Sequence, residues 1–64
     1  MKPTRRELQV LTLIQEGLTT KEVASRLQIS TRTVETYRRN INEKLQVRNV
    51  TAALCVARRL YLIE

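Results

Sequence analysis

The sequence contains no histidine, no aspartate and a single cysteine, Cys55, in 64 residues. One cysteine cannot form an intramolecular disulfide, and one chain with these residues cannot supply a zinc site of His and Cys ligands. General acid–base and phosphoryl-transfer chemistry also lack their usual parts, because there is no metal-binding set and no glycine-rich loop. We therefore expect no cofactor, no metal site and no enzymatic activity.

Residues that interrupt helices are equally scarce, with one Gly and one Pro. Apolar residues that recur at intervals of three and four then favour an all-helical fold. The two tyrosines are the only aromatic residues, which is too few for a surface that stacks single-stranded bases. The longest apolar run, residues 52–57, is too short to cross a bilayer, and the charged N-terminus is not followed by a signal-peptide core. We expect a cytoplasmic protein without a membrane segment.

Positive charge is the abundant property of the chain. Twelve Lys and Arg residues face six acidic ones, which gives a net charge of +6. Such a balance indicates a polyanionic partner, either nucleic acid or an anionic membrane surface. The length allows one domain, residues 1–64.

Four helix starts are visible in the sequence. Thr4 with Glu7 and Thr19 with Glu22 have capping-box spacing, Ser30 or Thr31 can cap a third helix, and Asn49 can cap a fourth. Gly17 suits the end of the first helix. The sequence predicts a compact all-α domain of four helices at about residues 4–16, 20–27, 31–45 and 50–60.

The stretch 20–39 has the layout of a helix-turn-helix, in which the second helix enters the major groove of DNA. Ala24 is a small residue where the two helices should approach most closely. The helix at 31–45 has one apolar face, formed by Val34, Tyr37, Ile41 and Leu45. At 100° per residue the opposite face is formed by Arg32, Glu35, Thr36 and Arg39. One face should therefore join the core and the other should meet a partner.

The outward residues have side chains that suit DNA bases. Arg39 can donate two hydrogen bonds to guanine, Glu35 can accept from cytosine N4, and Thr36 can touch a thymine methyl group. Glu35 could instead pair with Arg39 four residues on, a contact worth roughly 0.2–0.5 kcal/mol, and the sequence leaves both open. The residues suited to phosphate contact lie at the rims of this face and at the helix N-termini: Thr20, Lys21, Thr31, Arg32, Thr33, Arg38 and Lys44.

Two other functions compete with DNA binding. A protein-interaction module that docks on the transcription machinery would need an aromatic or aliphatic anchor, which the outward face of the helix at 31–45 lacks. A membrane-active cationic helix is disfavoured because the apolar residues divide into four capped segments. DNA binding remains the preferred prediction, with the interaction module as the alternative.

These features resemble the LuxR-type, or GerE-like, helix-turn-helix domain, which forms the effector domain of response regulators and quorum-sensing regulators. The residues that carry the resemblance include Thr4 with Glu7, residues 16–24, Leu27, residues 29–30 and 33–35, Asn40, Ile41, Lys44, Leu45, Val47 and Asn49. The resemblance implies sequence-specific binding of operator DNA by a bacterial transcription regulator. It places the base contacts on Glu35, Thr36 and Arg39.

The resemblance also implies partners. It predicts a homodimer on paired DNA half-sites, with a monomer in solution left open, and it leaves room for a contact with RNA polymerase. The dimer surface would lie on the last helix, at Val50, Leu54 and Arg58. Gln46 and Tyr61 stand where the family often has Gly, so a left-handed helix end could be lost at both places. Glu35 stands where a basic residue is frequent, so no operator sequence is transferred.

The last helix yields two further predictions about packing. Ala53, Val56, Ala57 and Leu60 should point inward, and Leu62 or Ile63 should close the core. Cys55 should be a small, buried or half-buried apolar residue.

Overall fold

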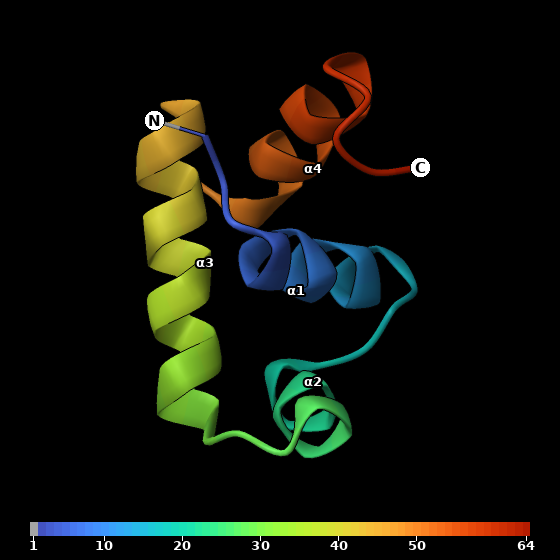
Figure 1. The fold of residues 1–64 in the computed structure, drawn as a ribbon, viewed down its shortest axis with the longest axis vertical. Helices are drawn as coiled ribbons and strands as arrows, with labels where there is room; N and C mark the ends of the chain where they lie inside the picture. The colour runs from blue at the N-terminus through green and yellow to red at the C-terminus, as the bar shows by residue number, and fades with distance from the viewer. Residues whose placement is uncertain (1) are drawn as a thin grey trace.

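The computed structural model describes residues 2–64, and within this range it contains four α-helices and no strand (Figure 1). The helices are α1 (Arg5–Gln15), α2 (Thr20–Leu27), α3 (Thr31–Leu45) and α4 (Val50–Arg59). The predicted all-α fold is confirmed, and so are the bounds of α2 and α3. The first helix is one residue shorter at each end than predicted, and α4 ends one residue earlier. None of the helices in the described residues has the length and apolar character needed to cross a membrane.

Both predicted capping boxes are formed. The Thr4 hydroxyl accepts from the Glu7 N–H at 3.2 Å, and the Glu7 carboxylate accepts from the Thr4 N–H at 2.8 Å. Thr19 and Glu22 make the same pair of bonds at 3.1 and 2.8 Å. Each box satisfies two backbone N–H groups that would otherwise lack a partner, so the first turns of α1 and α2 begin where the sequence placed them.

Single side chains cap the other two helices. Ser30, rather than Thr31, caps α3, and its hydroxyl accepts from the Thr33 N–H at 3.0 Å. Asn49 caps α4 by accepting from the Ala52 N–H at 2.9 Å. Ser and Asn suit this position because a short side-chain oxygen can reach the second or third helical N–H.

Two helices end in a left-handed residue that is not glycine. Gln28 follows α2 with φ 58°, and Gln46 follows α3 with φ 57°. Tyr61, just after α4, has φ 59°. Gln46 and Tyr61, the two positions where the family often has glycine, therefore both keep the left-handed conformation. The hydrogen bond that closes the end of α3 is also formed, from the Val47 N–H to the Asn42 carbonyl at 2.9 Å.

Replacing Gln46 with glycine should raise the free energy of unfolding by about 0.5–1 kcal/mol. A left-handed conformation costs a residue with a Cβ roughly 1–2 kcal/mol, and part of this gain is offset by the greater freedom of glycine in the unfolded chain. Urea denaturation would measure the difference. The matched control is Gln9→Gly in the interior of α1, where the same substitution should destabilise by about 1 kcal/mol. Equal destabilisation by both changes would contradict the strain at Gln46.

The core consists of two clusters that meet at α1. The first joins α1, α2 and α3 through Val10, Val23, Ala24 and Val34. The second joins α1, α3 and α4 through Leu11, Ile41, Ala53 and Ala57. Val10 and Leu11 are neighbours in the sequence, and each supplies one cluster. Figure 1 shows the consequence, with α1 between α2 and α4 and the long helix α3 beside them.

Two predictions about α4 were wrong. Leu60 is 55% exposed, because the helix ends at Arg59 and the chain turns away at Leu60. Leu62 and Ile63 then pack against the second cluster, as predicted. Cys55 is exposed, because it lies two residues from both Ala53 and Ala57, and a step of two residues rotates a side chain by about 200°, away from the core.

Candidate nucleic-acid interface

The two helices α2 and α3 pack through small and branched side chains. Ala24 is 4% exposed, and it shares a cluster with Val23 and Val34, both fully buried. Leu27, Ile29 and Tyr37 surround that cluster and are half-buried. The prediction that Ala24 lies at the closest approach of the helix-turn-helix agrees with this burial. A larger side chain there would push α2 away from α3.

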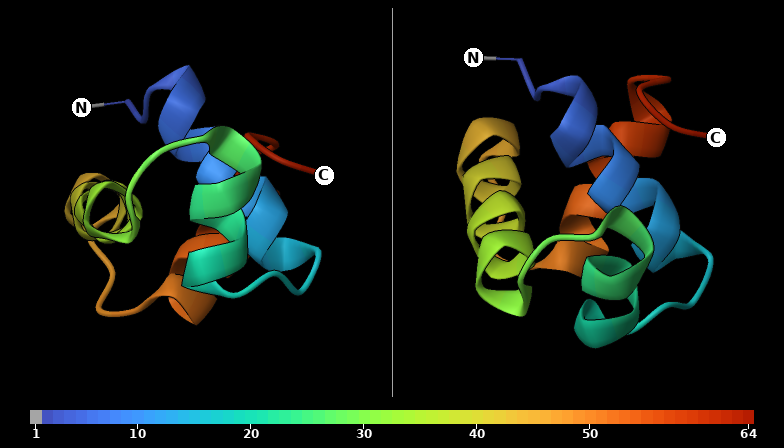
Figure 2. Two further views of the ribbon diagram at one scale, coloured as in Figure 1. Left: turned by 90° about the horizontal axis from the view of Figure 1, so that it is seen from below. Right: turned by 60° about the horizontal axis from the view of Figure 1, so that its bottom comes forward.

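The outward face of α3 is open. All four residues predicted on it are exposed, namely Arg32, Glu35, Thr36 and Arg39. On the opposite face Val34 and Ile41 are 0% and 1% exposed. The helix runs along the edge of the molecule in Figure 1 and in both views of Figure 2, and no other part of residues 2–64 lies over its outer side. Another surface can therefore approach these four side chains directly.

Glu35 and Arg39 do not form the ion pair that the sequence left open. Within residues 2–64 the sole ion pair joins Lys44 to Glu7. The Thr36 hydroxyl donates to the Arg32 carbonyl at 3.1 Å, which still leaves its oxygen free to accept. The carboxylate of Glu35 and the guanidinium of Arg39 thus remain available for a partner.

A hydrogen bond connects α3 to the beginning of α2. Nη1 of Arg38 donates to the Thr20 hydroxyl at 2.6 Å, and both residues are half-buried. This bond brings together two of the predicted phosphate contacts from different helices. Lys21, next to Thr20, is exposed at the same end of α2. Arg38 therefore fixes the N-terminus of α2, where backbone N–H groups favour an anion, relative to α3.

The predicted phosphate contacts at the start of α3 lie close to its cap. Thr31 is exposed and Thr33 is half-buried. The hydroxyl oxygens of Ser30 and Thr33 are 2.8 Å apart and share a hydrogen bond. Thr33 is therefore held by the cap, whereas Thr31 presents its side chain to solvent.

Lys44 forms an ion pair that the sequence did not predict. Its Nζ donates to both carboxylate oxygens of Glu7, at 2.9 and 3.1 Å. The Lys44 side chain is 18% exposed and that of Glu7 is 3% exposed. Lys44 is thus directed towards α1 and joins the last turn of α3 to the first turn of α1. Its predicted contact with phosphate stays a prediction, and because its ammonium group is engaged with Glu7 we leave it out of the contacts proposed below.

The carboxyl group of Glu7 is held in its ionised form. Burial raises its pKa, but the hydrogen bonds from the Thr4 backbone and from Lys44, together with the Lys44 charge, outweigh burial and bring the pKa below the ordinary 4.5. Hydrogen bonds from Thr19 likewise lower the pKa of the exposed Glu22. Sequence reasoning had treated Glu7 as a cap alone and had not predicted its ion pair.

The three residues predicted for a dimer surface differ in exposure. Val50 and Leu54 are half-buried and pack against the second core cluster, whereas Arg58 is exposed. The two apolar residues thus support the monomer core with part of their surface. Their role between subunits stays a prediction.

An open, basic second helix packed on a short first helix through a small residue defines a helix-turn-helix DNA-binding domain. Comparison with known families agrees with this class. Residues 3–57 match the family described as "Bacterial regulatory proteins, luxR family". The chain belongs to this family, and it is a LuxR-type helix-turn-helix domain, the DNA-binding domain of response regulators and other transcription regulators.

Individual relatives show how far the likeness extends. The transcriptional regulatory protein LiaR of Bacillus subtilis is 45% identical over 61 residues, which cover 95% of this chain and 29% of LiaR. The crystal structure of the response regulator ChrA from a heme-sensing two-component system superimposes with a TM-score of 0.92 at 38% identity and covers 98% of this chain and 31% of ChrA. The structure of the transcription factor GerE superimposes with a TM-score of 0.87 at 32% identity and covers 89% of this chain and 85% of GerE. The chain thus spans about a third of the length of LiaR and ChrA, and most of GerE.

Proposed function

We propose that this domain binds a specific double-stranded DNA sequence, with α3 in the major groove. The observation that carries the proposal is the exposed outward face of α3, which no other segment of residues 2–64 covers. Arg39 would donate to guanine, Glu35 would accept from cytosine N4, and Thr36 would contact a thymine methyl group. These three side chains lie on one face of a helix that the core holds in place, so they can read neighbouring base pairs together.

The phosphate backbone would be held on both sides of that face. Thr20 and Lys21 at the start of α2, Thr31 and Thr33 at the start of α3, and the arginines at positions 32 and 38 supply donors and positive charge. Phosphate contacts fix the orientation of a protein on the duplex, and base contacts select the sequence. The Arg38–Thr20 hydrogen bond at 2.6 Å supports this arrangement, because it joins the N-terminus of α2 to the middle of α3.

On DNA the domain would act as a homodimer, with half-sites about one helical turn apart. The α4 surface at Val50, Leu54 and Arg58 would form the contact between subunits. In a longer protein this domain would be the output part of a response regulator, as the names and lengths of LiaR and ChrA suggest. Docking on RNA polymerase would be a further function of such a regulator.

Selection of binding sites from random duplex DNA tests the proposal. The wild type should enrich one sequence, and Arg39→Ala should lose about 1–3 kcal/mol of discrimination at one base pair, because a bidentate contact to guanine is removed. Lys21→Ala should weaken binding to all sequences alike and reduce the slope of log K against log salt by about 1.

The control for this experiment is Arg48→Ala. Arg48 is exposed in the connection between α3 and α4, outside the proposed contacts, and its loss should leave the preferred sequence unchanged. Equal affinity of the wild type for every duplex would rule out sequence-specific reading. An unchanged preference in Arg39→Ala would remove Arg39 from the base contacts.

A further inference from the structure

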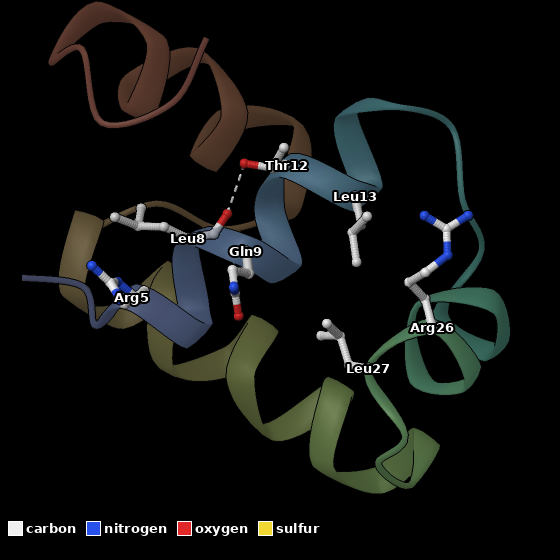
Figure 3. A pocket seen from close by; sticks show the side chains of 7 residues that line it. All are labelled: Arg5, Leu8, Gln9, Thr12, Leu13, Arg26 and Leu27. Carbon is white, nitrogen blue, oxygen red and sulfur yellow. Dashed lines mark hydrogen bonds between the residues drawn. The ribbon is translucent and has the colours of Figure 1, made fainter.

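A groove between α1 and the C-terminal end of α2 has no assigned role. Its volume is about 560 Å³, and Figure 3 shows the side chains that line it. They come from α1 and α2 alone: Arg5, Leu8, Gln9, Thr12, Leu13, Arg26 and Leu27. The groove therefore uses none of the residues proposed to contact DNA bases or phosphates, and none of those proposed for the dimer surface.

The walls of the groove are apolar. Leu8, Leu13 and Leu27 are half-buried, and in Figure 3 the side chains of Leu13 and Leu27 point towards each other from the two helices. The Thr12 hydroxyl donates to the Leu8 carbonyl at 2.9 Å, so its hydrogen is already used within α1. Such walls suit an aliphatic side chain rather than a polar ligand.

Positive charge stands at both ends of these walls. Arg5 lies at one end of the groove and Arg26 at the other (Figure 3), and both are exposed. Neither takes part in an ion pair within residues 2–64, and no acidic residue lines the groove. The charge of Arg26 also acts on Glu22, one turn earlier in α2, but the two groups form no direct ion pair. Two guanidinium groups around an apolar centre are complementary to carboxylates around an apolar side chain.

We propose that the groove binds an acidic segment of a partner protein, with a leucine-like side chain between the walls and a carboxylate on each arginine. Arg5 and Leu13 are eight positions apart in α1, so their backbones are about 12 Å apart along the helix axis at 1.5 Å per residue. Arg26 lies on the α2 side of the groove, at the Leu13 end (Figure 3). A helical partner would span this distance in about two turns. DNA is a poorer occupant, because phosphates could reach the arginines but would leave the three leucines without contact.

The position of the groove allows the partner and DNA to bind together. Arg26 lies in the last turn of α2, whereas Thr20 and Lys21 lie in its first turn. Arg5 opens α1, and the first turn of α1 lies beside the last turn of α3, where Lys44 binds Glu7. The proposed base contacts lie earlier on α3, at residues 35–39. An acidic partner docked here would add to the complex without displacing the duplex.

The test uses the 64-residue domain, which has its own core, and a fluorescently labelled helical peptide with leucines on one face and glutamates at both ends. Arg5→Glu with Arg26→Glu should weaken peptide binding by about tenfold or more, which corresponds to 1.4 kcal/mol or more. The matched control, Arg48→Glu with Arg59→Glu, changes the net charge equally at exposed positions outside the groove and should have a much smaller effect. Fluorescence anisotropy gives both affinities, and amide chemical shifts should move in α1 and at the end of α2.

A second variant separates shape from charge. Gln9→Trp keeps both arginines but fills the groove from an exposed position, so peptide binding should be lost while DNA binding and the melting temperature stay unchanged. The proposal is overturned if the peptide does not bind, if a version with lysines in place of glutamates binds as well, or if the shifts fall on α3. The proposal is also overturned if the Arg5→Glu, Arg26→Glu variant and the Arg48→Glu, Arg59→Glu control bind the peptide with equal affinity. DNA binding is measured separately, so failure of this proposal leaves the proposed function intact.

Discussion

Glu7→Ala should lower the free energy of unfolding by about 2–4 kcal/mol, and urea denaturation would measure the loss. The carboxylate is nearly inaccessible, and it accepts from the Thr4 N–H and from Lys44. Removing one partner of a buried ion pair costs about 3–5 kcal/mol. Here the cost is reduced because the Lys44 side chain is 18% exposed and can reach water. A domain of this size has roughly 3–10 kcal/mol in total, so the loss should be a large fraction of its stability.

The chain supplies its own control in Glu22→Ala. Glu22 occupies the same place in the second capping box, with the same bond to the N-cap N–H at 2.8 Å, but it is exposed and forms no ion pair among the described residues. Both substitutions remove the side-chain bond to the N-cap N–H, and only the change at Glu7 also leaves the Lys44 ammonium group without its carboxylate partner. A similar loss of stability in the two variants would show that the Lys44 pair contributes nothing beyond the cap.

The same contacts predict that the free energy of unfolding depends on pH. Because the pKa of Glu7 in the folded protein lies below the 4.5 expected when unfolded, the ionised carboxylate stabilises the fold at neutral pH. That contribution should disappear as the pH falls below about 4.5 and through the lower folded pKa. Glu7→Gln should flatten this part of the stability curve, and Glu22 should leave a smaller acid dependence, since its pKa is lowered too.

The helix bounds could be read from the sequence because each start has a local signal. Thr4, Thr19, Ser30 and Asn49 cap the helices through bonds that span three residues. Such bonds depend on neighbours in the chain and need no knowledge of the tertiary fold. The two faces of α3 follow in the same way from its periodicity. The sequence alone therefore predicts the outward face of α3 that the structure leaves exposed.

The Glu7–Lys44 pair could not be found in this way, because its partners lie 37 positions apart. Periodicity did contain a hint. Glu7 precedes Leu11 by four residues and Lys44 follows Ile41 by three, so both charges lie on the core side of their helices. A charged residue on a core face needs a partner of opposite charge. The positions of Glu7 and Lys44 could therefore have suggested that they pair with each other. Treating Lys44 as a rim residue missed this requirement.

The error at Leu60 has a different origin. Leu60 follows Ala57 by three residues, so it would face inward if α4 continued. The helix ends at Arg59, and Tyr61 takes a left-handed conformation that glycine usually supplies. No local signal marked this turn, because tyrosine is an unusual residue there. The contacts of Leu62 and Ile63 with the second core cluster stabilise it instead.

Leu11→Ala is expected to cost about 2–5 kcal/mol. Leu11 is fully buried in the cluster that joins α1 to α3 and α4. Alanine would leave a cavity between three helices, and each of them is also held by other contacts, so the space cannot close completely. Thermal unfolding followed by circular dichroism should show a large fall in melting temperature, and DNA affinity should weaken with the fraction unfolded.

Leu60→Ala makes the same chemical change at a site that is 55% exposed. It leaves no enclosed cavity, so its effect should stay within about 0.5 kcal/mol. The pair of variants thus compares one side-chain truncation inside the second cluster with one outside it. If Leu60→Ala destabilised the domain as strongly as Leu11→Ala, Leu60 would have to be buried in solution, and α4 would have to continue past Arg59. The melting curves of the two variants therefore test where the last helix ends as well as which leucine holds α1 in place.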